Sequence, residues 1–210
     1  MLIVVSAPSG AGKTSLCREI RKVVANLGYS VSHTTRVPRP GEVDGHDFYF
    51  VSELAFRQMT ERGEFAEWAR VHGNLYGTSA RALDEALERG EDILLDIDTQ
   101  GARQLRTRYP LGLYVFVVAP SMKELESRLR ERKSDAPQEI ARRMTRAIEE
   151  IAAWREYDYL ILNRHLDEAV RQLGCIIEAE RCRTSRLMLS IPDLPGSPDP
   201  LTSTDRGGVG

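Results

Sequence analysis

The most informative stretch of this sequence is SAPSGAGKTS, Ser6–Ser15. It follows an apolar run directly and opens an amphipathic segment, which is the context of a phosphate-binding loop, or P-loop. In a P-loop, backbone N–H groups surround a phosphate, and the N-terminus of the following helix adds partial positive charge. The strict pattern begins with glycine where this chain has Ala7, so the assignment depends on context as well as on the letters. We predict a nucleotide site here; the alternative is a turn that only joins a strand to a helix.

Each residue type in the P-loop has a physical reason. Gly10 and Gly12 allow the backbone to approach a phosphate closely. The Lys13 amine reaches the β- and γ-phosphates, and the Thr14 hydroxyl is placed to ligate Mg²⁺. The residues predicted to hold the nucleotide are Ser9, Gly10, Ala11, Gly12, Lys13, Thr14 and Ser15. Such a loop predicts nucleotide binding and leaves the reaction open.

A second informative stretch is LLDIDTQG, Leu94–Gly101. An apolar strand that ends in aspartate is where a carboxylate close to Mg²⁺ and the P-loop is expected, so Asp96 is a candidate metal ligand beside Thr14. Asp96 and Asp98 alternate along the strand end and can both face one cleft; the alternative is that they cap the strand end. Residues 98–101 also fit the DxxG pattern of GTPases, but Asn163-Arg164-His165 does not supply the guanine motif that a GTPase needs.

Outside these motifs, apolar runs alternate with amphipathic segments. Continuous apolar runs suit strands of a parallel sheet covered on both faces, and they are Leu2–Ser6, Ile93–Ile97, Leu113–Val118 and Tyr159–Asn163. Helices are predicted over Gly12–Leu27, over Ser79–Arg89, after a cap at Ser121, after a cap at Asp135, and over about Asp167–Arg183. The first is expected to end at a left-handed Gly28 and the second at Gly90. This alternation predicts an α/β fold.

Two stretches break the alternation. Ser30–Thr78 is rich in glycine, aromatic and charged residues, with short alternating runs such as HDFYFV, and here we predict a small lobe with its own antiparallel sheet. From Thr184 onward the chain is rich in proline, glycine, serine and aspartate. Because this segment has too little apolar content to form a core, residues 184–210 are predicted to be a disordered tail.

The composition is that of an ordinary globular protein and excludes several classes. Of 210 residues, 41% are apolar and 29% are charged, and 29 basic against 31 acidic residues give a net charge of −2. This balance argues against nucleic acid or an anionic membrane as the main partner. The longest apolar run, Leu111–Ala119, is too short to span a bilayer. Three cysteines without metal-ligand spacing favour the reducing cytoplasm.

Two further clusters suit a phosphate ester that carries a guanine base. Arg36 and Arg39, on a proline-rich turn, can clamp one phosphate through charge-assisted hydrogen bonds; the alternative is a solvated surface turn. Glu67 lies next to Trp68 and is followed by GNLYGT, residues 73–78. A carboxylate can accept both N–H donors on the Watson–Crick edge of guanine, and adenine lacks that pair.

Four stretches together resemble the guanylate kinase family: SAPSGAGKT, SVSHTTRVPRPGEVDG, EFAEWARVHGNLYGTS and LLDIDTQGA. They occur in the family's order and spacing, and the resemblance runs from about Leu2 to Arg183. It implies ATP-dependent phosphorylation of GMP to GDP with Mg²⁺. It also implies a P-loop nucleoside-monophosphate-kinase-like fold, in which helices flank a parallel sheet. An inserted GMP-binding lobe with a small mixed sheet and a mobile helical lid complete that fold.

The resemblance assigns boundaries to these parts. The core is expected over residues 1–31, 81–125 and 148–183. The GMP-binding lobe is expected over residues 32–80, the lid over 126–147 and the disordered tail over 184–210.

The resemblance also implies roles for single residues. The residues implied to hold the GMP phosphate are Arg36, Arg39 and Tyr76, and those at the guanine base are Ser32, Glu67, Thr78 and Asp98. Of these, Glu67 and Asp98 read the N–H groups. The implied catalytic residues are Lys13, with Arg128, Arg132 and Arg143 in the lid, and Asn163 is implied to lie near the adenine. A basic lid suits a reaction whose catalysis is positioning plus stabilisation of spread negative charge.

The chain departs from the family pattern at three places. Phe48 stands where the family usually has a tyrosine whose hydroxyl contacts the GMP phosphate. Because neighbouring side chains of a strand point to opposite faces, Tyr49 is expected to face away from that phosphate. Lys133 replaces a usual glycine in the lid, and Arg164-His165 replaces an acidic pair after Asn163. The first departure bears on GMP affinity, and the others bear on lid motion and the ATP edge of the site.

Three functions remain open, and an active GMP kinase is favoured. A catalytically inactive guanylate-kinase-like module that binds proteins typically lacks the P-loop lysine or the phosphate-binding arginines, whereas Lys13, Arg36 and Arg39 are all present. A P-loop kinase for another small phosphate ester would not need Glu67 together with Asp98. We therefore expect ATP and GMP as substrates, Mg²⁺ as cofactor, no nucleic-acid or membrane partner, and a cytoplasmic location.

Overall fold

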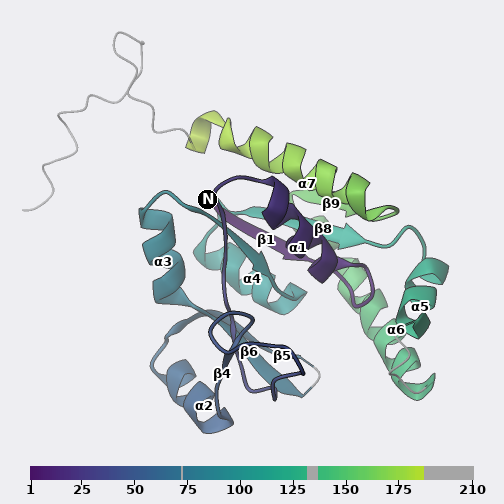
Figure 1. The fold of residues 1–210 in the computed structure, drawn as a ribbon, viewed down its shortest axis with the longest axis horizontal. Coiled ribbons are helices and arrows are strands. Elements are labelled where there is room, and N and C mark those ends of the chain that lie inside the picture. The colour runs from purple at the N-terminus through teal and green to yellow at the C-terminus, as the bar shows by residue number, and fades with distance from the viewer. Residues whose placement is uncertain (72, 132–136, 187–210) are drawn as a thin grey trace, which may run out of the picture. The chain divides into compact units, whose positions relative to one another are not determined.

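The core of the chain is a five-stranded sheet in which every neighbouring pair of strands is parallel (Figure 1). The computed structural model describes residues 1–71, 73–131 and 137–186. The strand order is β2-β7-β1-β8-β9, with the bounds Leu27–Tyr29, Asp92–Asp96, Leu2–Ser6, Leu113–Val118 and Tyr159–Leu162. All five strands lie in the first of two compact units, which comprise residues 1–174 and 175–210. The α/β prediction and its four apolar strands are confirmed.

The register of the central strands positions the site. Every residue of β1 is buried, as its continuous apolar sequence predicts. Val5 of β1 pairs with Asp96 of β7, so the carboxyl ends of these two strands lie next to each other. The P-loop that follows β1 and the acidic segment that follows β7 therefore emerge at the same edge of the sheet, where open α/β sheets bind their ligands.

Helices connect these strands, and α3 and α4 cover one face of the sheet. There Leu83, Ala102 and Leu105 form one core cluster with Leu2 and Leu95. The helix bounds are Lys13–Val23 for α1, Ala80–Glu88 for α3, Thr99–Arg108 for α4, Met122–Glu131 for α5, Pro137–Ala152 for α6 and Leu166–Arg181 for α7; a 3₁₀ turn, η1, spans Ala153–Glu156. In the described part of the chain, none of the helices is both long and apolar enough to cross a membrane.

Two of the predicted helix signals are confirmed. The Ser121 hydroxyl accepts a hydrogen bond from the Glu124 N–H at 3.0 Å and caps α5. Gly90, with a φ of 74°, follows the last turn of α3. The predicted cap at Asp135 lies outside the described residues.

The first helix is shorter than predicted. α1 ends at Val23, and Leu27–Tyr29 form β2, which pairs with β7. The chain turns at Asn26, whose φ of 58° lies in the left-handed region that asparagine tolerates, so the prediction of a left-handed Gly28 is wrong. Leu27 continues the helical spacing of Val23 and Val24, but Leu27 and Tyr29 also alternate as an edge strand does, and the pairing with β7 decides between the two.

The small lobe has its own sheet and its own small core. Its strand order is β4-β3-β6-β5, with the bounds Tyr49–Phe50, His33–Thr34, Asn74–Ser79 and Phe65–Val71. β6 is antiparallel to both neighbours, but β3 and β4 are parallel. The mixed sheet that the resemblance implies is therefore confirmed, and the antiparallel sheet predicted from the alternating runs is wrong. A long connection over residues 35–48 allows this parallel pairing. Phe56, from α2 over Glu53–Glu61, packs with Phe65 and Leu75.

The second unit contains the end of α7 and a 3₁₀ turn, η2, over Thr184–Arg186. The Arg186 guanidinium pairs with the buried Glu180 carboxylate at 2.7 Å. Residues 184–186 of the predicted tail therefore form a turn that contacts Glu180. The rest of the predicted tail, residues 187–210, lies outside the described residues.

Candidate active site

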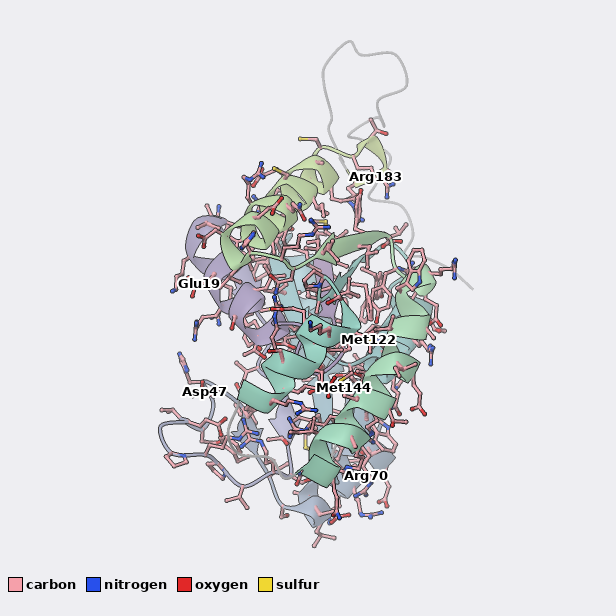
Figure 2. The ribbon with its side chains drawn as sticks, turned by 90° about the vertical axis from the view of Figure 1, so that its right-hand side faces the viewer. Glu19, Asp47, Arg70, Met122, Met144 and Arg183 are labelled. Carbon is pink, nitrogen blue, oxygen red and sulfur yellow. The ribbon has the colours of Figure 1, made fainter. Side chains whose placement is uncertain are left out.

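A pocket of about 420 Å³ opens where the P-loop, the end of β7 and the small lobe meet. Figure 2 shows Asp47, which lines this pocket, on the small-lobe side of α1, the helix that carries Glu19. The predicted site residues that line the pocket are Lys13, Thr14, Ser32, Glu67, Tyr76, Asp96 and Asp98. The pocket therefore brings together residues that are far apart in the sequence. They come from the P-loop, from the end of β7 and from the small lobe.

The P-loop has the backbone geometry that its glycines predict. Gly10 and Gly12 have φ values of 91° and 92°, in the region that side chains disfavour. Gly12 also lacks room for a side chain, because a Cβ there would overlap the amide nitrogen of Asn163. That amide is buried and donates a hydrogen bond to the Ala11 carbonyl at 2.8 Å. Asn163 thus contacts the P-loop backbone, and its implied position near the adenine stays a prediction.

Lys13 is held at the carboxyl end of β7. Its amine forms an ion pair with Asp96 and donates a hydrogen bond to the Ile97 carbonyl at 2.9 Å. Burial alone would lower the pKa of Lys13, but the negative charge and the hydrogen bond of Asp96 outweigh it, so the pKa is raised. The amine is therefore a fixed positive charge at the mouth of the P-loop.

Thr14 and Asp96 present the donor set that Mg²⁺ prefers. A hydroxyl and a carboxylate from these residues both line the pocket beside the P-loop. Mg²⁺ is commonly held by one or two protein oxygens together with substrate phosphates and water. The residues present therefore fit a magnesium ion that arrives with a nucleotide.

Glu67 is a buried carboxylate at the small-lobe side of the pocket. Its side chain is on β5, and the Thr78 hydroxyl of β6 donates to it at 2.5 Å. Burial raises the pKa of Glu67 to about 7, and the nearby charge of Asp98 adds to the shift. A carboxylate this poorly solvated has unfilled hydrogen-bonding capacity that a ligand with N–H donors can satisfy.

Asp98 fulfils both interpretations that the sequence left open. Its carboxylate caps α4 by accepting the Gly101 N–H at 2.9 Å, and it also lines the pocket. One oxygen is engaged by the helix, so the orientation of the other is restricted. The strand-end cap and the cleft carboxylate are the same residue.

The two arginines of the proline-rich turn are both tied to Glu42. The Arg36 guanidinium binds the Glu42 carboxylate through two hydrogen bonds, at 2.8 and 2.9 Å, and the Arg39 backbone N–H donates to it at 2.7 Å. Hydrogen bonding to Glu42 raises the pKa of Arg36 above its usual value. Glu42 lines the pocket, whereas the Arg39 side chain is exposed. Neither Arg36 nor Arg39 is among the described residues that line the pocket, and Glu42 fixes the Arg36 guanidinium beside it.

Phe48 and Tyr49 point to opposite faces of the small sheet, as predicted. Phe48 lines the pocket, with the Arg36 guanidinium 5.3 Å from its ring centroid and the Tyr76 ring 6.0 Å away. Tyr49 instead stacks on His33 with 4.8 Å between ring centroids. The pocket face of this strand therefore has a phenyl ring where a hydroxyl was expected from the family pattern.

The implied lid arginines are only partly assembled at this site. Arg128 of α5 donates to Glu124 at 3.0 Å and to the Asn163 carbonyl at 3.1 Å, and Arg143 is half-buried on α6. Neither is among the described residues that line the pocket. Arg132, like the departure at Lys133, lies outside the described residues.

Among the described residues that received no role from the sequence, Glu42, Gly101 and Glu150 contact residues assigned to the site. Glu42 orients Arg36, Gly101 lies between two carboxylates, and Glu150 of α6 accepts the Ser9 N–H of the P-loop at 3.3 Å. Glu42 has a sequence signal, since it closes the TRVPRPGE run that contains both arginines. The other two depend on contacts between distant segments, which a single sequence does not reveal.

Comparisons with known proteins agree with this arrangement. The sequence model of the family described as guanylate kinase matches residues 1–180. Guanylate kinase from Geobacter metallireducens is 52% identical over 193 residues, covering 92% of this chain and 95% of that protein. Guanylate kinase from Geobacter sulfurreducens is 50% identical over 194 residues, covering 92% and 96%. The crystal structure of guanylate kinase from Anaplasma phagocytophilum, 32% identical, matches with a TM-score of 0.74 over 89% of this chain and 88% of that chain. This chain therefore belongs to the guanylate kinase family.

Proposed function

We propose that this chain transfers the γ-phosphoryl group of ATP to GMP, giving ADP and GDP. The observation that carries the proposal is that Lys13 of the P-loop lines the same pocket as the carboxylates Glu67 and Asp98. The same pocket thus contains an amine that can bind a phosphoryl group and two carboxylates that can bind a base with N–H donors. The family membership supports the same reaction.

In this proposal the small lobe selects the base. Glu67 and Asp98 accept the N–H groups of guanine, and Ser32 and Thr78 make polar contacts at the same base. Adenine offers no matching pair of donors, so its binding would leave a buried carboxylate unpaired. A site built around such groups rejects the wrong base more strongly than an apolar pocket can.

The GMP phosphate is assigned to Arg36, Arg39 and Tyr76. This role of Arg36 is supported by its two hydrogen bonds to Glu42 and by its guanidinium lying 5.3 Å from the centroid of the Phe48 ring, since Glu42 and Phe48 both line the pocket. The planar guanidinium presents paired donors that match phosphate oxygens. Arg39 joins from its exposed loop, and the Tyr76 hydroxyl supplies one more donor.

The ATP phosphates are assigned to the P-loop, Ser9 to Ser15. An oxygen of the GMP phosphate attacks the γ-phosphorus, and the bond from that phosphorus to the bridging oxygen of ADP breaks. Lys13, with Arg128, Arg132 and Arg143 from the lid, stabilises the negative charge that spreads over the transferring group. Asn163 acts at the ATP site by supporting the P-loop through the Ala11 carbonyl.

Mg²⁺ is the proposed cofactor, with Thr14 and Asp96 as the residues that hold it. When bound, it would supply positive charge that neutralises the phosphoryl oxygens. Asp96 also pairs with the Lys13 amine, so the same carboxylate would hold the metal and position the lysine.

These assignments also divide the chain into a core, a GMP-binding lobe and a lid. We assign residues 1–31, 81–125 and 148–183 to the core, 32–80 to the GMP-binding lobe and 126–147 to the lid. The three free thiols, at Cys17, Cys175 and Cys182, support a cytoplasmic location. The partners assigned to the chain are ATP and GMP, without a role for nucleic acid or membrane.

A coupled assay tests the proposed reaction. ADP formation from ATP is measured with GMP, AMP, CMP and UMP offered separately. We expect turnover with GMP and at most a small fraction of it with the others. Turnover with AMP or a pyrimidine nucleotide at the GMP rate would favour a kinase for another phosphate ester, and no turnover with any of them would favour the inactive binding module.

A further inference from the structure

Gly101 contacts both carboxylates that face the pocket. It lies in the first turn of α4, and its N–H donates to the Asp98 carboxylate at 2.9 Å. On the other side, a Cβ at Gly101 would overlap one carboxylate oxygen of Glu67 and would lie 3.0 Å from its carboxyl carbon. One residue thus touches Asp98 through its backbone and leaves room for Glu67 by having no side chain.

The conformation of α4 does not require a glycine at this position. Gly101 is helical and buried, and it is not among the residues with positive φ. In a helix interior, glycine is less favourable than alanine, because a glycine loses more backbone conformational entropy when the chain folds. The glycine therefore costs helix stability, and the space that Glu67 occupies is the physical reason for it.

A second residue of α4 holds the backbone next to Glu67. Gln104, on the same face one turn later, accepts the Trp68 N–H at 3.1 Å and donates to the Trp68 carbonyl at 2.8 Å. β5 is an edge strand, so these backbone groups have no further strand to pair with. α4 packs on β1 of the core sheet and on β5 of the small lobe, and so it joins the two (Figure 1).

We propose that Gly101 is a specificity-determining positioning residue for the guanine base. Because it has no side chain, the Glu67 carboxylate can lie against α4, and the Gly101 N–H orients the Asp98 carboxylate. One residue therefore fixes the positions of both carboxylates. The inference rests on the proposed function, in which these two carboxylates read guanine. Gly101 itself contacts neither the reacting atoms nor the phosphates, so it acts through Glu67 and Asp98.

The test compares GMP with IMP, whose base lacks the 2-amino group of guanine. The ratio of kcat/KM for GMP to kcat/KM for IMP is measured for the wild type and for Gly101→Ala. We expect the ratio to fall by about tenfold or more, mainly through KM for GMP, since a displaced Glu67 no longer pairs fully with guanine. KM for ATP is expected to stay unchanged. An unchanged ratio in a folded Gly101→Ala protein would overturn the inference.

Thr107→Ala is the matched control, because Thr107 lies on the exposed side of α4 and bonds the Arg103 carbonyl. It alters the same helix without touching either carboxylate, so its ratio should equal that of the wild type. A comparable loss of ratio in this control would assign the effect to helix stability and overturn the proposal.

Two further outcomes separate folding from function. If Gly101→Ala fails to fold, the same change in a Glu67→Ala background is expected to fold, since the overlapping carboxylate is gone; a double variant that also fails to fold would contradict the contact. If the wild type itself does not prefer GMP to IMP, the proposed function fails. If the wild type prefers GMP and folded Gly101→Ala keeps that preference, only this inference fails.

Discussion

The Thr78 hydroxyl donates a 2.5 Å hydrogen bond to the Glu67 carboxylate, and both side chains are buried. This one donor does not replace the solvation that Glu67 loses, and the pKa of the carboxyl is raised to about 7. Thr78 therefore fixes the position of the carboxylate without fully stabilising its charge. The remaining stabilisation is left for a bound ligand to provide, and this links base recognition to pH.

GMP affinity should fall as pH is lowered through 7. Below its pKa, Glu67 carries a proton and cannot accept two N–H donors, so the loss should approach tenfold per pH unit below about 7. The measurement is the Kd for GMP by calorimetry at pH 6, 7 and 8. The GMP phosphate also titrates, near pH ~6. Glu67→Gln is the control for this effect, and an equal pH dependence in both proteins would contradict the assignment.

The buried Glu67 carboxylate should lower the free energy of unfolding at high pH. Because its pKa is raised from 4.5 to about 7, the folded state keeps a proton that the unfolded state has lost, so stability falls as pH rises between these values. Glu67→Gln keeps the bond from Thr78 and removes the charge. It should raise the free energy of unfolding by about 1–3 kcal/mol at pH 8 and by less at pH 5. Denaturant unfolding at both pH values checks this, with the exposed Glu61→Gln as control. Equal effects at pH 5 and pH 8 would refute it.

Phe48→Tyr should improve GMP binding. A tyrosine at this position would add a hydroxyl on the pocket face beside Arg36, where Phe48 now offers only a ring. KM for GMP should fall about threefold to tenfold, at the lower end of what a hydrogen bond to a charged group contributes, because a water molecule can replace part of it. A phosphate held equally in ground and transition states leaves kcat unchanged. Tyr49→Phe, on the opposite face, should change neither constant, and a rise in KM from this variant would show that Tyr49 makes the contact.

Two truncated proteins should differ in stability, although their C-terminal ends differ by only three residues. Removal of residues 187–210 should change the free energy of unfolding by less than about 0.5 kcal/mol, since their composition offers no core. Removal of residues 184–210 also removes Arg186, whose guanidinium lies 2.7 Å from the buried Glu180 carboxylate, and leaves Arg183 at 3.5 Å from it. The second truncation should therefore destabilise the chain by about 1–3 kcal/mol. Equal melting temperatures for the two truncated proteins would contradict a role for this ion pair.

The core was predictable from the sequence because its strands are continuous apolar runs. β1 and β8 have the predicted bounds, β7 is shifted by one residue toward the N-terminus, and β9 ends one residue earlier than predicted. β2 and α4 were not predictable in this way. Leu27–Tyr29 fits a helix face as well as an edge strand, and TQGARQLRTR has too few apolar residues to show a helical period. Pairing with β7 and capping by Asp98 decide these two elements, and both are contacts rather than patterns.

The candidate site was predictable by residue type and less so by geometry. Lys13, Glu67 and Asp98 belong to motifs whose chemistry is readable, and the pocket brings them together. The pairing of Arg36 with Glu42 and the space for Glu67 at Gly101 arise only when distant segments pack. The charged residues of a site can be identified from the sequence. The partners that neutralise or position each of them are known only from the fold.

The most direct test of the account is kcat/KM for GMP in Glu67→Gln, measured together with KM for ATP. The amide turns an N–H₂ group toward a guanine donor and leaves it unpaired, at a cost of about 1–3 kcal/mol or more. We predict that kcat/KM for GMP falls by about tenfold to a hundredfold, while KM for ATP is unchanged because the proposed ATP site is in the core. A protein that keeps wild-type kcat/KM for GMP, or that loses GMP and ATP affinity together, would contradict it.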